Sequence, residues 1–358
     1  MKYLYPLLLL LTLHSYAHEI TLDEKIAGIT VLGFHGTTLE IEDKISQEVL
    51  QGLGGVILFD QDPLNKMKRK NIVNAKQLKK LNHQLQILGK GKLLICIDEE
   101  GGKVARLKAK DGFEVFSSAQ ELAQSGDINK SQQQYSAMAE MLKEGGINTN
   151  FAPDVDLLYG YNPIIAGKKR SYSNNPQEVV KYASVFVDEH RKQGVITVLK
   201  HFPGHGSSKG DSHKGFTDVT TTWSATELVP FMMMIETKKA DMIMTAHIYN
   251  KTLDETYPAT LSKKINTDIL RKKLNYDGVI ITDDLQMAAI HKDYSLRERV
   301  TLALNSGVDI LLFANQLAEP LALQELIDVV KEQVKVGAIK EKRIDEAYAR
   351  VQKLKEKL

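Results

Sequence analysis

The residues of this chain best suited to chemistry lie in one short segment. It holds a lysine, three histidines and an aspartate, namely Lys200, His201, His205, Asp211 and His213. An apolar run at 195–199 comes directly before it, so the pattern predicts a buried strand that leads into a glycine-bearing loop. Imidazoles near neutral pH transfer protons or bind metal ions. The segment therefore predicts an active site. The alternative is a tight structural loop whose histidines are exposed to solvent and have no function.

A second candidate is the pair of carboxylates Asp283 and Asp284, which follows the apolar residues 279–282. A carboxylate at the end of a strand can serve as a covalent nucleophile, a metal ligand or a general base. Aspartate is also favoured as the N-cap of a helix, and residues 285–289 could start one. The pattern allows both functions, with one residue of the pair in each.

A third candidate is the loop at 98–106, where three acids and two glycines precede two bases. Its charged members are Asp98, Glu99, Glu100, Lys103 and Arg106. A carboxylate beside a guanidinium can fix neighbouring sugar hydroxyls through paired hydrogen bonds, which suits a carbohydrate pocket. A surface ion-pair network of little energetic value is the alternative. The basic run at 168–172, which contains Arg170, is a weaker signal because loop cations are usually solvated.

Three chemistries could use these parts. A metal hydrolase could take its ligands from His201, His205, Asp211 and His213, although their spacing matches no strong zinc signature. A Schiff-base aldolase could use Lys200. A retaining glycosidase could use Asp283 as nucleophile and the Asp211/His213 pair as acid and base, which leaves the 98–106 loop to hold the sugar. Only the third chemistry uses every one of these loops.

The elements that would position these residues follow a regular pattern. Eight apolar runs are predicted as strands, at 31–34, 55–59, 93–97, 148–152, 196–199, 242–245, 279–282 and 310–313. Helical periodicity between them predicts helices at 77–88, 131–144, 176–193, 224–238 and 262–274, and a closing helix within 338–358. Runs that are apolar throughout suit strands covered on both faces. Eight such units predict an α/β fold, a single (β/α)₈ TIM barrel, with a doubly wound open sheet as the structural runner-up.

The polar residues that end these runs support the barrel. They are Asp60, Asp98, Asp154, Lys200 with His201, His247 and Asp283. Active sites of such barrels are built at the carboxyl ends of the strands, so these side chains should meet at one mouth.

Composition excludes some classes of function. The 358 residues are 43% hydrophobic and carry a net charge of +2, so no electrostatic footprint for nucleic acid is present. The basic run at 66–70 is interpreted as a solvated helix face. Cys96 is the only cysteine, and its apolar neighbours predict a buried structural thiol.

The first residues predict a cleaved export signal at 1–17, because Lys2, an apolar stretch and small residues near Ala17 follow one another; an uncleaved N-terminal anchor is the alternative. The stretch is short for a membrane span, so no stable membrane insertion is expected once it is removed. Residues 18–358 are then the catalytic barrel, and a periplasmic or secreted location is expected.

Three motifs together resemble glycoside hydrolase family 3. They are Lys200 to Gly206 with Asp211-Ser212-His213, the 98–102 loop, and residues 278–285. More narrowly, they resemble its bacterial exo-β-N-acetylglucosaminidase branch, the enzymes of peptidoglycan recycling. The resemblance implies that Asp283 attacks the anomeric carbon, and that His213, paired with Asp211, protonates the leaving oxygen and later activates water. It also implies that the terminal N-acetylglucosamine is bound by Asp98, Arg106, Arg170, Lys200 and His201.

The expected reaction is thus retaining hydrolysis of terminal β-linked N-acetylglucosamine from wall fragments or related oligosaccharides, with no metal and no cofactor. Departures from the branch are Lys103 in place of the usual arginine, a different loop at 60–62, and the export signal. Two rivals stay open: a phosphorylase of the same glycosides, and a non-catalytic muropeptide-binding protein.

Overall fold

Eight parallel strands form one sheet in the computed structural model, which describes residues 19–63, 68–211, 215–316 and 320–358. The strands are β1 (Thr30–Gly33), β2 (Gly55–Ile57), β3 (Leu94–Ile97), β4 (Thr149–Asn150), β5 (Ile196–Phe202), β6 (Met242–Thr245), β7 (Val279–Ile281) and β8 (Leu311–Phe313). Each strand from β1 to β7 pairs with the next one in chain order, and β1 also pairs with β8. A parallel bridge between Ile281 and Ile310 joins β7 to the start of β8, so the sheet closes and the predicted (β/α)₈ barrel is confirmed.

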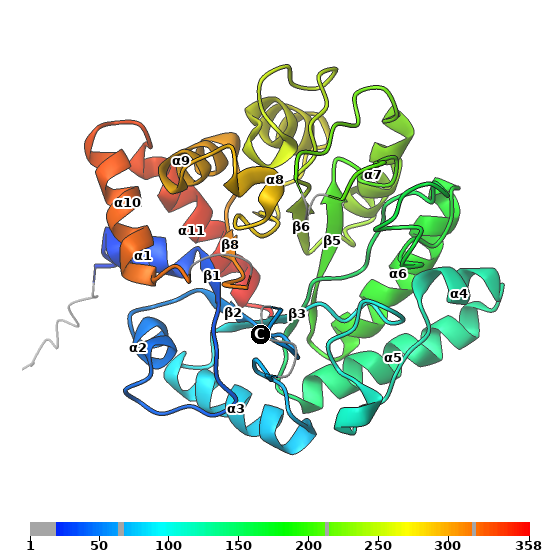
Figure 1. Ribbon diagram of the computed structural model, residues 1–358, viewed down its shortest axis with the longest axis horizontal. Coiled ribbons are helices and arrows are strands. Elements are labelled where there is room, and N and C mark those ends of the chain that lie inside the picture. Colours follow the sequence, from blue (N-terminus) through cyan, green and yellow to red (C-terminus); the bar gives the residue numbers. More distant parts are fainter. Residues whose placement is uncertain (1–18, 64–67, 212–214, 317–319) are drawn as a thin grey trace, which may run out of the picture.

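Helices surround this sheet (Figure 1). They are α1 (Leu22–Gly28), α2 (Lys44–Leu50), α3 (Ala75–Leu88), α4 (Ala119–Gln124), α5 (Ile128–Glu144), α6 (Pro176–Lys192), α7 (Val229–Glu236), α8 (Ala288–His291), α9 (Leu296–Ser306), α10 (Leu323–Lys335) and α11 (Glu341–Lys355). Three short 3₁₀ helices are η1 (Ala109–Asp111), η2 (Ala225–Leu228) and η3 (Ala259–Leu261), and η4 (Lys264–Lys273) is a π-helix. The helix predicted at 224–238 is divided into η2 and α7, with Pro230 in the first turn of α7, where its missing N–H costs no helical hydrogen bond.

Helix α6 illustrates how local sequence sets an element. Asn175 caps it by accepting a hydrogen bond from the Gln177 N–H, and Pro176 occupies its first position. Apolar residues spaced three and four apart, including Val179, Tyr182 and Phe186, turn one face toward the sheet. The chain then leaves the helix through Gly194 at a positive φ of 71°, which places β5 directly after it.

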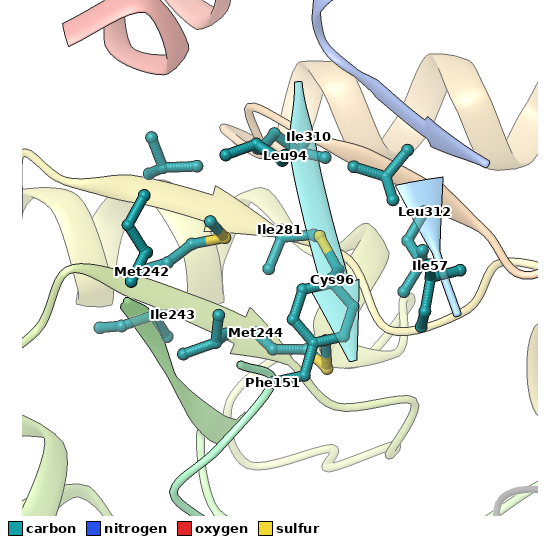
Figure 2. Close-up of a cluster of buried hydrophobic side chains, with 14 of the residues drawn as sticks. Ile57, Leu94, Cys96, Phe151, Met242, Ile243, Met244, Ile281, Ile310 and Leu312 are labelled. Atoms are coloured by element: carbon teal, nitrogen blue, oxygen red, sulfur yellow. The ribbon is translucent and has the colours of Figure 1, made fainter. Parts of the chain in front are cut away.

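The strands are buried along their whole length, which explains their continuous apolar sequence. Figure 2 shows side chains from β2, β3, β6 and β7 meeting with those of Phe151 and Leu312 in one cluster. Cys96 belongs to this cluster and is fully buried, as predicted, and burial raises the pKa of its thiol far above the ordinary value.

The prediction of a solvated helix face at 66–70 is wrong for the residues that can be described there. Lys68–Lys70 are not helical, and Lys70 is completely buried, with its ammonium donating to the carbonyl oxygens of Ala314 at 3.0 Å and Asn315 at 2.8 Å. Arg69 pairs with Asp111 of η1. Tertiary contacts therefore overrode the local pattern of charge.

The predicted export signal at 1–17 lies outside the described residues and stays a prediction. In the part of the chain that is described, every helix lacks either the length or the apolar character that a membrane crossing requires.

Candidate active site

A pocket opens at the carboxyl ends of the strands. Apolar side chains of the barrel interior line it from below, among them Ile57, Phe151, Met244 and Leu312. Its charged lining contains six of the eight residues that the sequence predicted, namely Asp98, Arg106, Arg170, Lys200, His201 and Asp283. The pocket thus combines an apolar floor with polar walls contributed by several loops, as expected for a small-molecule site.

Lys200 at the end of β5 is the centre of one ion-pair group. Its ammonium lies 3.0 Å from Asp98 Oδ1 and 2.7 Å from Glu100 Oε1, while Arg106 holds the other oxygen of Asp98 at 2.9 Å. Burial alone would raise the pKa of Asp98, but Lys200 and Arg106 outweigh it and hold this pKa well below its ordinary value. Asp98 is therefore a fixed carboxylate acceptor at neutral pH.

Arg170 forms the second group. Its guanidinium contacts Glu100 through two hydrogen bonds of 2.8 Å, lies 3.2 Å from Asp154 Oδ2, and approaches His201 Nε2 at 3.3 Å. The Arg170 side chain is only 8% exposed. The sequence context suggested a solvated loop cation, and that expectation is wrong. Because Glu100 and Asp154 hold the Arg170 guanidinium in one orientation, the side chains that contact it are also restricted in position.

The first group depends on a loop that Glu99 shapes. Glu99 Oε2 accepts hydrogen bonds from the backbone N–H groups of Arg106 at 2.8 Å and Leu107 at 3.0 Å. The three consecutive acids therefore differ in function: Glu99 folds the loop back on itself, whereas Asp98 and Glu100 face the pocket.

His201 is oriented by Asp156, whose Oδ2 lies 2.7 Å from the ring Nδ1. The other oxygen of Asp156 accepts the His205 backbone N–H at 2.7 Å, which fixes the start of the following loop. Burial first, and the positive charge of Arg170 second, lower the pKa of His201 to about 4. A neutral imidazole that donates from Nδ1 to Asp156 then presents Nε2 toward Arg170 as an acceptor.

Asp283 and Asp284 follow β7 and also line the pocket. The Asp284 backbone N–H donates to Asp283 Oδ1 at 2.8 Å, and Asp284 Oδ1 accepts from the N–H groups of Gln286 and Ala314, both at 3.0 Å. Burial raises the pKa of Asp284 to about 6.

The N-cap interpretation of this pair is wrong. Helix α8 begins later, at Ala288, with Met287 as its N-cap residue. Asp284 instead ties the end of β7 to the end of β8 through the Ala314 N–H, which holds Asp283 at the pocket wall.

The two remaining predicted residues belong to the loop after β5. Asp211 is described but is not part of the pocket lining; its charge acts on Lys168, which does line the pocket. His213 lies outside the described residues, so the pairing of Asp211 with His213 stays a prediction.

The aldolase alternative conflicts with the surroundings of Lys200. Burial would lower its pKa, yet Asp98 and Glu100 outweigh burial and raise it. A Schiff base requires the neutral amine, which this arrangement disfavours.

The metal-ligand set proposed from the sequence, His201, His205, Asp211 and His213, does not form a cluster among the residues that the structure describes. Three ligand-type atoms come within 4.8 Å of one another at Asp154, Asp156 and His201, a different set. Arg170 already occupies this corner, since its guanidinium contacts Asp154 and His201. A fixed cation there opposes the binding of a second one.

Sequence reasoning gave no role to several residues of the site. The sequence pattern predicts Asp154 only as a strand end and does not single out Asp156, and it places Glu100 and Lys168 within charged runs. The available signal was the Asp-Val-Asp order at 154–156 directly after the fourth apolar run, since alternate residues leaving a strand point the same way.

The chain also matches known proteins over nearly its whole length. Residues 21–354 match the model of the glycosyl hydrolase family 3 N terminal domain. The chain belongs to glycosyl hydrolase family 3. It is 33% identical over 351 residues to beta-hexosaminidase A of Pseudoalteromonas piscicida, covering 90% of this chain and 56% of that protein. It is 34% identical over 311 residues to a beta-hexosaminidase of Tolumonas auensis, covering 83% and 85%.

A solved family 3 structure shares the fold. The β-N-acetylglucosaminidase of Paenibacillus sp. str. FPU-7 superposes with a TM-score of 0.84 at 31% identity, covering 95% of this chain and 63% of that one. The chain thus spans little more than half the length of some relatives and most of the length of others. The predicted glycoside hydrolase family is confirmed.

Proposed function

We propose that this family 3 chain is a retaining exo-β-N-acetylglucosaminidase that removes non-reducing terminal β-linked N-acetylglucosamine. The observation that supports the proposal is the pocket itself, which Asp283 lines together with a set of fixed ion pairs at the carboxyl ends of the barrel strands. The names of the relatives support the substrate class, since those proteins are called hexosaminidases or N-acetylglucosaminidases.

The ion-pair wall suits the holding of a sugar. Asp98 is a carboxylate kept charged by Lys200 and Arg106, so it can accept hydrogen bonds from two hydroxyl groups. Arg106 and Lys200 remain donors beside it, and Arg170 orders His201 behind them. Because these groups are held by one another before substrate arrives, little ordering entropy is lost when the sugar binds.

The proposed chemistry proceeds in two displacements. Asp283 attacks the anomeric carbon, the bond to the leaving oxygen breaks, and His213, paired with Asp211, gives that oxygen its proton. His213 then takes a proton from water, which attacks the glycosyl-aspartate and releases the sugar with its original anomeric configuration. In this scheme the Asp284 N–H and the bond to β8 hold the Asp283 carboxylate at the pocket wall.

We further propose that the enzyme acts outside the cytoplasm on wall fragments or chitin-type oligosaccharides. The support is the export signal predicted at residues 1–17 and the resemblance to peptidoglycan-recycling enzymes.

The test is the release of aryl alcohol from an aryl β-N-acetylglucosaminide, with the aryl β-glucoside as comparison, a chelator as control, and NMR of the first product anomer. Turnover of the N-acetyl sugar alone, unaffected by chelator and giving the β-anomer, is the expected result. Glycosyl phosphate formed in phosphate buffer would establish phosphorolysis instead. Binding of the sugar without turnover would leave a binding protein, and inactivation by the chelator would point to a metal.

A further inference from the structure

His247 follows β6 and is one of the polar residues that end the apolar runs of the sequence, yet the reaction described above does not use it. The residue is 2% exposed and is not part of the pocket lining. Its ring Nε2 lies 2.8 Å from the carbonyl oxygen of Asp284, the residue directly after Asp283. A buried imidazole therefore contacts the neighbour of the proposed nucleophile from outside the pocket.

This contact fixes where the His247 ring carries a hydrogen. A backbone carbonyl oxygen only accepts, so Nε2 must be protonated and must donate to Asp284. The other ring nitrogen, Nδ1, lies 2.8 Å from Thr260 Oγ1 in η3. The single hydroxyl hydrogen of Thr260 can go to Nδ1 or to the Ala246 carbonyl oxygen at 2.9 Å, and in both cases Nε2 keeps its hydrogen. His247 is thus a donor to Asp284 whose orientation Thr260 fixes.

The peptide that receives this hydrogen bond is also held at its other end. The Leu285 N–H belongs to the same peptide as the Asp284 carbonyl, and it donates to Leu312 O of β8 at 3.0 Å. The Asp284 side chain accepts the Ala314 N–H at 3.0 Å, just beyond β8. Residue 284 is therefore fixed from the β8 side by backbone groups and from the β6 side by His247.

Residue 284 in turn orients the Asp283 carboxylate. The Asp284 N–H donates to Asp283 Oδ1 at 2.8 Å, so the backbone conformation at residue 284 sets the direction of this hydrogen bond. The ladder between β6 and β7 ends at the pair Met244 and Ile281, before the chain reaches Asp283. Beyond this pair, His247 continues the link between β6 and the segment that carries the nucleophile.

We propose that His247 is a positioning residue that keeps Asp283 in line with the anomeric carbon. The inference rests on the proposed function, because it takes Asp283 as the nucleophile. A displacement of about 1 Å at a reacting group can cost about 100-fold in rate. The ion pairs that would hold the sugar form a different group, around Asp98 and Arg170. Loss of the His247 contact should therefore lower kcat and leave sugar binding nearly unchanged.

Two substitutions separate the two contacts of the ring. The amide of asparagine reaches the place of Nδ1 and can meet Thr260, whereas the longer glutamine reaches the place of Nε2 and can donate to Asp284. For His247→Asn we expect kcat on the aryl β-N-acetylglucosaminide to fall about 10- to 100-fold, while the Kd for N-acetylglucosamine, measured by calorimetry, changes less than about 2-fold. His247→Gln should restore most of kcat.

The matched control is Tyr276→Phe, before the amino end of β7. Tyr276 is also buried, and its hydroxyl donates to Val279 O at 3.0 Å. The substitution removes a hydrogen bond to a carbonyl of the same strand at the end remote from Asp283. It should lower the thermal unfolding midpoint and leave kcat per folded molecule unchanged.

An unchanged kcat in His247→Asn, or an equal loss in the asparagine and glutamine variants, would overturn the proposal. If His247→Asn does not fold, NMR of the ring nitrogens in the wild type tests the same contact, with the His247 signals identified by their loss in His247→Gln. A hydrogen on Nε2 is expected, and a ring with its hydrogen on Nδ1 alone would contradict the proposal. A wild-type enzyme that does not turn over the aryl substrate would instead refute the proposed function, so the two failures are distinct.

Discussion

The two ends of the barrel both bury carboxylates, yet they balance them differently. At the amino ends of the strands, Asp241 and Asp309 precede β6 and β8. Arg191 and Lys357 contact Asp241, and Arg271, Arg343 and Arg350 contact Asp309. Two carboxylates there meet five cations, drawn mostly from the outer helices and the end of the chain, so each acid is tied to the ring of helices.

At the carboxyl ends several carboxyl groups share a few buried cations. Six carboxyl groups line or adjoin the pocket, namely Asp98, Glu100, Asp154, Asp156, Asp283 and Asp284, and three cations contact members of this set, namely Arg106, Arg170 and Lys200. Burial and the nearby charge of Asp156 raise the pKa of Asp154 to about 7, and burial raises that of Asp284 to about 6.

The difference separates stability from function. At the amino end each of the two buried acids is paired with more than one cation and serves the fold, whereas the acids at the other end surround a pocket and two of them have raised pKa values. A substitution at the carboxyl end should therefore lower kcat, whereas a substitution at the amino end should lower the free energy of unfolding.

The largest expected effect is that of Asp283→Asn at the carboxyl end. Loss of the nucleophile should lower kcat about 10⁴-fold or more, while the thermal unfolding midpoint stays close to that of the wild type. Steady-state kinetics on the aryl N-acetylglucosaminide and calorimetry measure the two quantities. A variant with near wild-type turnover would remove Asp283 from the mechanism.

His213→Ala should depend on the leaving group. A general acid contributes about 10²- to 10⁴-fold, and this loss should be seen with sugars and poorly acidic phenols as leaving groups. Substrates with acidic phenols need little protonation, so their first step should slow much less. Plotting kcat/KM against the pKa of the phenol tests this, and an equal loss across the series would contradict the role of His213 as acid.

Asp309→Asn tests the amino end. Three guanidinium groups would lose the carboxylate that neutralises them, and breaking such a buried pair costs about 3–5 kcal/mol of unfolding free energy. Urea denaturation should show this loss, while kcat per folded molecule stays unchanged. Reduced kcat with unaltered stability would reverse the functional division between the two ends.

The smallest effect is expected in the interior, at His190. Its ring contacts Phe186 O at 2.9 Å through Nδ1 and Asn150 Nδ2 at 3.1 Å through Nε2, an arrangement that suits the neutral imidazole. Burial lowers its pKa to about 4. The native state therefore binds fewer protons than the unfolded state between about pH 6.5 and 4, and stability falls as the pH falls through this range.

His190→Gln removes that contribution. The free energy of unfolding of the wild type minus that of the variant should shrink by up to about 3 kcal/mol between pH 6.5 and 4. Urea titrations at a series of pH values measure this difference. A difference that does not vary with pH would mean that His190 is not held neutral.

Much of the fold was predictable because the strands are buried on both faces. Burial on both faces demands apolar residues at every position, and the resulting runs placed all eight strands within a few residues. The candidate pocket was predictable for a related reason, since parallel strands end at one mouth and the polar residues just beyond them must meet there.

The linear order could not show which charged residues are solvated. Lys70 and Arg170 lie in basic runs, yet both are buried, because their partners come from segments far away in the chain: Ala314 and Asn315 for Lys70, Glu100 and Asp154 for Arg170. The same limit applied to Asp284, whose contact across to Ala314 replaced the helix cap expected from its neighbours.

The sequence by itself determined the barrel, the family and the side chains that gather at its mouth, because apolar periodicity and short motifs are local properties. Only the tertiary structure decided how those charges pair and which of them are buried. Such pairings depend on distances between residues tens to hundreds of positions apart, and those distances are set when the sheet closes.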